Sequence, residues 1–193
     1  QMRAELIKLR QRIDTTFIYV THDQTEAMTL GDRIVIMKDG FIQQVGTPQQ
    51  VFDHPANLFV AGFIGTPQMN FFDGSLVKHD GRYFIETDGL SVELSEDKQQ
   101  RLAAKDVAEQ QVTVGVRPEH VIIGQSGIPA KVDVSEMMGS SVHLHMSALG
   151  GDMIAIVPLN GEAAHYPMGM DVKLSFGGHV AHVFSKDDNK NLE

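Results

Sequence analysis

Residues Tyr19–Met28 have the sequence Tyr-Val-Thr-His-Asp-Gln-Thr-Glu-Ala-Met, the most informative segment of the chain. It begins inside an apolar run, Phe17–Val20, that is rich in β-branched and aromatic residues. Such a run is typical of a strand buried on both faces, as in an α/β sheet. The polar residues Thr21–Asp23 end the run, and helical spacing of apolar residues follows from Gln24 to Leu30. We therefore expect a strand, a short turn and a helix in this order.

A histidine stands in the middle of this turn. His22 directly follows the predicted strand, and ligands of open α/β sheets bind beyond the carboxyl ends of the strands. An imidazole N–H at that place can donate a hydrogen bond to a phosphate without adding the full charge of a lysine. His22 could equally cap the helix that follows. The local pattern alone leaves both interpretations open.

The flanking residues predict further short elements. Upstream, Met2, Leu6, Leu9 and Ile13 are spaced as on one face of a helix. Downstream, two apolar runs flank Asp39-Gly40, a pair that tolerates the positive φ angles of a type I′ hairpin turn.

Two more helices are predicted before the character of the sequence changes. Thr47–Gln50 is typical of a helix start, with Thr at the N-cap, Pro at the first position and Gln at the third. A second short helix is expected over Asn57–Ile64. From Asn70 onward, short alternating runs separated by turns predict a small barrel or sandwich, interrupted by a helix over Glu96–Lys105. We place a domain boundary near Gly65, between an α/β portion at 1–64 and an all-β domain at 65–193.

Composition narrows the function classes. The 193 residues include no cysteine, which excludes disulfides and thiolate metal sites and suits a cytoplasmic protein. The formal net charge is -9 and Lys and Arg are scattered, which disfavours nucleic acid as the main partner. No run approaches the roughly 18 apolar residues of a membrane span, and the charged N-terminal residues do not predict a signal peptide.

Two parts of the chain resemble a known family. Val20–Gly46 resembles the switch-histidine region of ABC transporter ATPases, and its continuation to Phe71 is similar to the maltose and multiple-sugar importer subfamily. Val114–His120, with the sequence Val-Gly-Val-Arg-Pro-Glu-His, resembles a motif of that subfamily's C-terminal regulatory domain, the TOBE type of OB-like barrel. The resemblance implies an α/β remnant of an ABC nucleotide-binding domain followed by an OB-like (TOBE) regulatory domain.

The resemblance implies that His22 is the catalytic switch histidine, which would contact the γ-phosphate of ATP. Asp23 and Glu26 fall in the first turn of the next predicted helix, where carboxylates suit the helix dipole, so we expect a structural role for them. For Arg117 and Glu119 the local pattern leaves two interpretations open, a regulatory contact or a role in fixing the turn where a strand ends at Pro118.

Several motifs of such ATPases are absent from the sequence. It contains no Gly-x-x-x-x-Gly-Lys-Ser/Thr phosphate loop (Walker A), no Leu-Ser-Gly-Gly-Gln signature and no acidic Mg²⁺-binding strand motif (Walker B). We therefore expect the C-terminal part of a longer subunit. ATP and Mg²⁺ would serve that parent, whereas residues 1–193 alone would be inactive and hold no cofactor beyond the His22 contact.

Other residues have weaker chemical patterns. His143 and His145 share one strand face and could bind a metal, but two exposed histidines are the simpler interpretation, and no metal site is predicted. His179 and His182 are expected at the surface. Met137–Gly139 is expected to supply core and turn, although methionine also suits binding surfaces.

The function implied by the resemblance is ATP-driven sugar import. The subunit would form a homodimer, bind membrane-spanning permease subunits, accept a regulatory protein on its TOBE domain and lie peripherally at the inner face of the cell membrane. The alternatives are a TOBE module of an oxyanion, polyamine or iron importer that senses a small ligand or docks a regulator, and an oligonucleotide-binding barrel, which the acidic balance disfavours.

Overall fold

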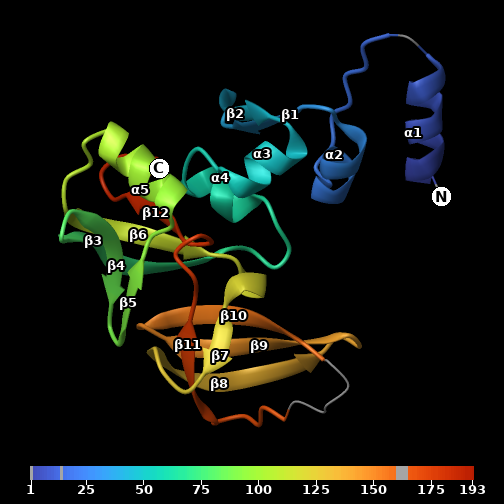
Figure 1. The fold of residues 1–193 in the computed structure, drawn as a ribbon. Coiled ribbons are helices and arrows are strands. Elements are labelled where there is room, and N and C mark those ends of the chain that lie inside the picture. The colour runs from blue at the N-terminus through green and yellow to red at the C-terminus, as the bar shows by residue number, and fades with distance from the viewer. Residues whose placement is uncertain (1, 14, 160–164) are drawn as a thin grey trace. The chain divides into compact units, whose positions relative to one another are not determined.

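The structure is a computed structural model that describes residues 2–13, 15–159 and 165–193. The chain divides into two compact units, Gln1–Gly65 and Thr66–Glu193 (Figure 1). Each unit has a hydrophobic core of its own.

Unit 1 contains short helices and one hairpin. Its elements are α1 (Met2–Arg12), α2 (Gln24–Leu30), β1 (Ile34–Lys38), β2 (Phe41–Gly46), α3 (Pro48–Asp53) and α4 (Leu58–Phe63). Its buried core consists of aliphatic side chains from the hairpin and helices, namely Ile34, Ile36, Val51, Val60 and Ile64. Helix α2 packs on this core through Ala27 and Met28.

The predicted hairpin is confirmed, with its turn. Strands β1 and β2 pair antiparallel and join at Asp39 and Gly40, whose φ angles are 51° and 81°. Both values are positive, as a type I′ turn requires. A bulge between Ile36 and Met37 shifts the register.

The predicted helix starts are also confirmed. At α3 the Thr47 hydroxyl accepts a hydrogen bond from the Gln50 amide, and the Gln50 side chain accepts one from the Thr47 amide, which completes a capping box. At α4 the Asn57 side chain accepts from the Val60 amide at 2.9 Å. These caps satisfy backbone donors that have no partner within the helix.

The predicted strand over Phe17–Val20 is wrong for this chain. These residues have no strand pairing, and Ile18 and Val20 are 90% and 91% exposed. A strand is stable only when a neighbour completes its backbone hydrogen bonds. The described strands of unit 1, β1 and β2, pair with each other. Among the described residues the run therefore has no strand partner, and its side chains stay half or more exposed.

Unit 2 consists of two five-stranded antiparallel sheets. One sheet has the order β12-β6-β3-β4-β5 and the other β10-β9-β8-β11-β7. The strands of the first are β3 (Asn70–His79), β4 (Arg82–Thr87), β5 (Leu90–Glu93), β6 (Gln110–Val116) and β12 (His182–Ser185). Those of the second are β7 (Ile122–Gly124), β8 (Ile128–Met137), β9 (Ser141–Ala148), β10 (Gly151–Pro158) and β11 (Asp171–Ser175).

Alternating side chains build one core from both sheets. Along β9, Val142, Leu144 and Met146 are almost fully buried while the residues between them are half-exposed. Leu76 and Val114 of the other sheet belong to the same buried cluster. The period-two pattern therefore places one face of each sheet in a common interior. Strands β7 and β10 at the two ends of their sheet contact each other, so this sheet curls as a barrel does.

Buried polar side chains connect segments of unit 2. The buried Asn70 side chain of β3 donates to the Ile154 carbonyl oxygen at 2.8 Å and accepts from the Ile154 amide at 2.7 Å, so it bonds an edge strand of the other sheet.

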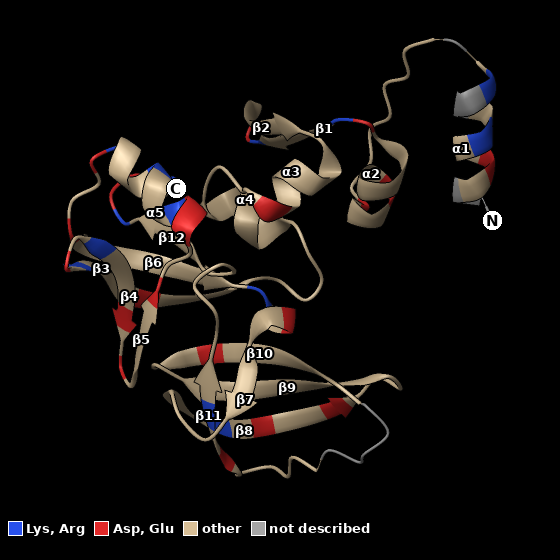
Figure 2. Ribbon diagram, in the orientation of Figure 1, with Lys and Arg blue, Asp and Glu red and all other residues tan. Residues whose placement is uncertain are grey.

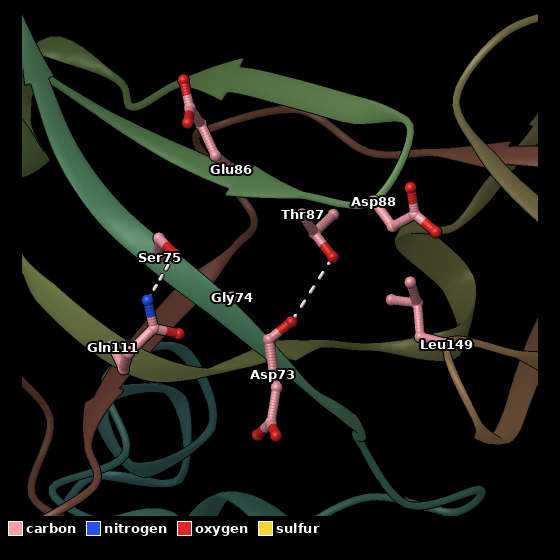
Figure 3. A pocket seen from close by; sticks show the side chains of 8 residues that line it. All are labelled: Asp73, Gly74, Ser75, Glu86, Thr87, Asp88, Gln111 and Leu149. Atoms are coloured by element: carbon pink, nitrogen blue, oxygen red, sulfur yellow. Dashed lines mark hydrogen bonds between the residues drawn. The ribbon is translucent and has the colours of Figure 1, made fainter.

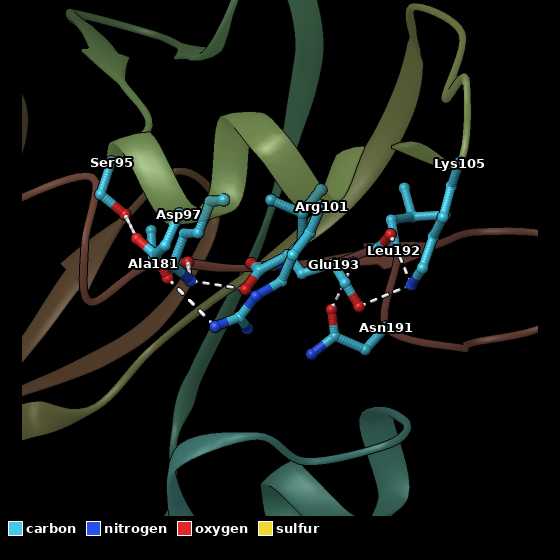
Figure 4. A network of polar contacts seen from close by, with 10 residues as sticks. Ser95, Asp97, Arg101, Lys105, Ala181, Asn191, Leu192 and Glu193 are labelled. Carbon is cyan, nitrogen blue, oxygen red and sulfur yellow. Dashed lines mark hydrogen bonds and ion pairs between the residues drawn. The ribbon is translucent and has the colours of Figure 1, made fainter. Parts of the chain in front are cut away.

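Another connection involves the predicted helix over 96–105, which forms as α5 (Glu96–Ala104). Its buried Lys98 ammonium lies 2.6 Å from the Glu193 carboxylate and also donates to the Ala181 carbonyl oxygen. Figure 4 labels these two partners, Glu193 and Ala181. Burial raises the pKa of the Glu193 carboxyl, and the Lys98 charge opposes that rise. The connection joins α5 to the chain segment around β12.

Candidate functional site

The predicted catalytic residue, His22, lies in a loop that the structure describes. His22 lies between the extended residues 17–21 and helix α2, and its side chain is exposed. Asp23, not His22, is the N-cap of α2, since the Asp23 carboxylate accepts from the Glu26 amide at 3.1 Å. The capping interpretation of His22 is therefore wrong, and the imidazole is available to a ligand.

The loop around His22 is held by a small hydrogen-bonded network. The Glu26 carboxylate accepts from the Thr21 hydroxyl at 2.7 Å and from the Tyr19 hydroxyl at 3.1 Å. The Thr21 hydroxyl in turn accepts from the Asp23 amide at 2.9 Å. The hydrogen bond to Glu26 raises the pKa of Tyr19. The residues on both sides of His22 are thus fixed while the ring itself projects into solvent.

Glu26 and Gln24 have contacts that sequence reasoning did not predict. The structural role expected of Asp23 and Glu26 agrees with these contacts, but no local signal indicated that Glu26 would bind Tyr19 and Thr21. Gln24 of the same helix bonds to Phe63 and Gly65, which are about 40 positions away in the sequence. Such long-range partners leave no pattern in a single sequence.

The regulatory candidates Arg117 and Glu119 lie on either side of Pro118. Strand β6 ends at Val116, and a short 3-10 helix, η1 (Pro118–His120), follows. The Arg117 side chain is buried, whereas Glu119 is exposed. Helix η1 contacts β10 of the other sheet. Of the two candidates, Glu119 alone offers its charge to a partner at the surface.

The remaining histidines do not form a metal site in the described part of the chain. His143 and His145 share the outer face of β9, and His145 Nε2 lies 3.2 Å from the Glu136 carboxylate of β8. This acidic neighbour was not expected. No group of three potential ligands close enough for a metal occurs among the described residues.

Two weaker expectations are corrected. His182 is buried and not at the surface, because its strand β12 lies in the core of unit 2, whereas His179 is exposed as expected. Met137 and Met138 are 64% and 56% exposed and do not belong to the core. They lie at and directly after the end of β8, whose last four residues are all exposed.

A polar depression of about 540 Å³ lies on the first sheet of unit 2, remote in sequence from His22 (Figure 3). Its carboxylates come from Asp73, Glu86 and Asp88. Asp73 is paired with Lys186 at 2.7 Å and Glu86 with His79 at 2.7 Å. None of the predicted site residues lines it.

Charge and hydrophobicity agree with the sequence analysis. Lys and Arg lie on several elements, and on α1 and α5 they are mixed with Asp or Glu (Figure 2). None of the described helices has the length and apolarity of a transmembrane span.

Two known domain families match the chain over most of unit 2. The MalK OB fold domain matches residues 65–121, and the TOBE domain matches residues 114–184. The predicted fold class is therefore confirmed: the chain is mostly β-sheet with a few short helices, and it contains a MalK OB fold domain and a TOBE domain.

Similarity to whole proteins extends over nearly the entire chain. YurJ of Bacillus subtilis, an uncharacterised ABC transporter ATP-binding protein, is 46% identical over 167 residues, which are 83% of this chain and 45% of YurJ. YcjV of Escherichia coli, also an uncharacterised ABC transporter ATP-binding protein, is 40% identical over 97% of this chain and 51% of YcjV. The oligosaccharides import ATP-binding protein MsmX of Bacillus subtilis is 42% identical over 97% of this chain and 52% of MsmX.

A solved structure is also similar to this chain. The molybdate-bound form of the cytoplasmic molybdate-binding protein ModG matches 58% of this chain and 92% of ModG, with a TM-score of 0.43 and 15% identity. These values are too low to bear on function.

The fold and the matches define an OB and TOBE region of the MalK type. The chain belongs to the ABC transporter ATP-binding proteins, with this region at residues 65–184. It spans about half the length of the relatives named here.

Proposed function

We propose that the chain is the C-terminal portion of the ATP-hydrolysing subunit of a carbohydrate importer. The observation that carries this proposal is the 42% identity with MsmX, an oligosaccharides import protein, over 97% of this chain. Residues 1–64 would belong to the nucleotide-binding domain, and residues 65–193 would be the regulatory and dimerisation domain. ATP and Mg²⁺ would bind to the complete subunit.

In this function His22 acts on the γ-phosphate of ATP. Its exposed ring can donate a hydrogen bond to a phosphoryl oxygen, and the Asp23 cap together with the Thr21–Glu26 hydrogen bond keeps its backbone in place. Phosphoryl transfer depends mainly on positioning and on stabilising the charge of the transferred group. A hydrogen-bond donor at this place therefore contributes directly to the rate.

The proposed partners follow from the same family. The complete subunit would form a homodimer, bind permease subunits and lie at the inner face of the cell membrane. A regulatory protein would meet the exposed Glu119 on the TOBE domain.

Residues 1–193 alone are expected to lack tight binding of ATP, because the sequence contains no phosphate loop. Calorimetric titration with ATP and Mg²⁺ measures this binding, and saturation at micromolar ATP would contradict the proposal. The same titration with molybdate addresses an oxyanion-sensing TOBE module, for which we expect no saturable heat.

A chimera tests the carbohydrate part of the proposal. The region of MsmX that matches this chain is replaced by residues 1–193, and oligosaccharide uptake is measured in cells that lack MsmX. We expect uptake to be restored, and to be lost again in the chimera with His22→Ala. A chimera that is expressed and reaches the membrane, yet restores no uptake, would contradict the assignment to carbohydrate import.

A further inference from the structure

A single glutamine joins the His22 loop to the end of unit 1. Gln24 is the first residue of α2 and lies two positions after His22. Its side-chain oxygen accepts a hydrogen bond from the Gly65 amide at 2.9 Å, and its side-chain nitrogen donates to the Phe63 carbonyl oxygen. Both partners belong to the end of α4, so one planar amide ties two segments about 40 positions apart.

The end of α4 needs such a partner. The last four carbonyl groups of a helix find no N–H donor within the helix, and Phe63 provides one of these carbonyl groups. Gly65 follows the extended C-cap residue Ile64 and has a φ angle of 113°, a value that favours glycine. The Gln24 amide therefore satisfies the helix end and fixes the turn that follows.

Gly65 is also the last residue of unit 1, and the chain continues from it into unit 2. We infer that Gln24 is a positioning residue, which holds His22 in register with the Phe63–Gly65 connection. A displacement of this connection is then transmitted through Gln24 to the first turn of α2 and to His22. The inference rests on the proposed role of His22 in ATP hydrolysis.

The chain offers a matched control for this contact. Gln44 of β2 makes the same pair of bonds, with its nitrogen 2.9 Å from the His54 carbonyl oxygen and its oxygen 2.8 Å from the Ala56 amide. Its partners lie between α3 and α4. Gln44→Leu thus removes the same number and type of hydrogen bonds as Gln24→Leu, but not next to His22.

Amide hydrogen exchange, followed by NMR on residues 1–193, tests the physical coupling. In Gln24→Leu we expect the Gly65 amide to exchange about tenfold faster, together with shifted resonances for residues 21–26. In Gln44→Leu the Ala56 amide should exchange faster while residues 21–26 keep their resonances. Unchanged exchange at Gly65, or equal shifts of residues 21–26 in both variants, would overturn the coupling.

ATP turnover by the complete subunit tests the catalytic consequence. We expect Gln24→Leu to lower kcat by about tenfold with KM for ATP nearly unchanged, since His22 is misplaced while ATP still binds. Gln44→Leu should keep the wild-type kcat. If His22→Ala abolishes turnover and Gln24→Leu does not lower it, the positioning role is wrong and the proposed function stands. If His22→Ala keeps full turnover, the proposed function fails, and the positioning role fails with it.

Discussion

At the scale of single residues, Asn70 lies where strand β3 of one sheet meets β10 of the other. Strand β10 is an edge strand of its sheet. The Asn70 side-chain amide bonds both the N–H and the C=O of Ile154 there, as a neighbouring strand would. A buried backbone pair without partners is costly, so this contact supports the junction between the two sheets.

Replacement of Asn70 is expected to destabilise unit 2. Asn70→Leu removes both hydrogen bonds and leaves the Ile154 amide and carbonyl without their partners, at an expected cost of about 2–4 kcal/mol. Urea unfolding followed by circular dichroism measures the change. Gln111→Leu is the control, because it removes one exposed bond to Ser75 and should cost less than about 0.5 kcal/mol. Equal losses in the two variants would show that Asn70 does not join the sheets.

The sequence is sufficient to predict His22 as a site residue, but not to predict the residues that surround it. The motif gave the position of the histidine and the helix after it. The partners of Glu26, Gln24 and Asn70 depend on segments brought together by packing, and no local periodicity records them. Tertiary contacts therefore determine the details of the site that the motif leaves open.

At the scale of elements, local chemistry predicted the hairpin and the helix starts. Asp39-Gly40 and the Thr47 capping box act within a few residues, so their sequence signals are sufficient. The strand over Phe17–Val20 was wrong because a strand depends on neighbours that a local pattern cannot supply. Burial of Met137 was wrong as well: its side chain is 64% exposed although its paired neighbour Val142 is buried, and a local pattern cannot distinguish the two.

Helix α5 gives a prediction at this scale through its buried ion pair. Lys98→Met leaves the Glu193 carboxylate buried without its counter-charge, at an expected cost of about 3–5 kcal/mol at pH 7. Lys98→Met combined with Glu193→Leu should recover most of this loss, because a well-packed apolar pair needs no desolvation of charge. Lys190→Met, which removes an exposed pair with Asp188, should cost less than about 1 kcal/mol.

The cost of Lys98→Met is also expected to depend on pH. Burial raises the pKa of Glu193 above its ordinary value of 4.5, so the folded state keeps this proton more strongly than the unfolded state. The loss in the free energy of unfolding that comes from ionising buried Glu193 is absent below the ordinary pKa, and it grows as pH rises through the raised pKa. Urea unfolding at pH 4 and pH 7 measures it, and a larger loss at pH 4 would contradict the account.

At the scale of the whole molecule, unit 2 has its own core and both of its sheets, so residues 66–193 are expected to fold without unit 1. We expect these residues to dimerise through the regulatory domain. The competing route is association of the exposed run Phe17–Val20 with another chain, since an apolar edge readily pairs. The two routes differ in which residues are required.

Sedimentation of residues 1–193 and of residues 66–193 over a concentration series distinguishes these routes. We expect both to be dimers with two-fold symmetry. If residues 1–193 dimerise and residues 66–193 do not, the result favours association through the exposed run. If both are monomers at high micromolar concentration, the result contradicts a dimerisation domain in this chain.

We propose that His22 acts on ATP in a transport ATPase, and turnover by the complete subunit with His22→Ala is the decisive measurement. We expect kcat to fall by about 100-fold or more while ATP binding and folding are retained, since one donor to the transition-state charge is lost. His179→Ala, which changes an exposed histidine of unit 2, should keep the wild-type kcat. Wild-type turnover by the His22→Ala subunit would contradict the claim.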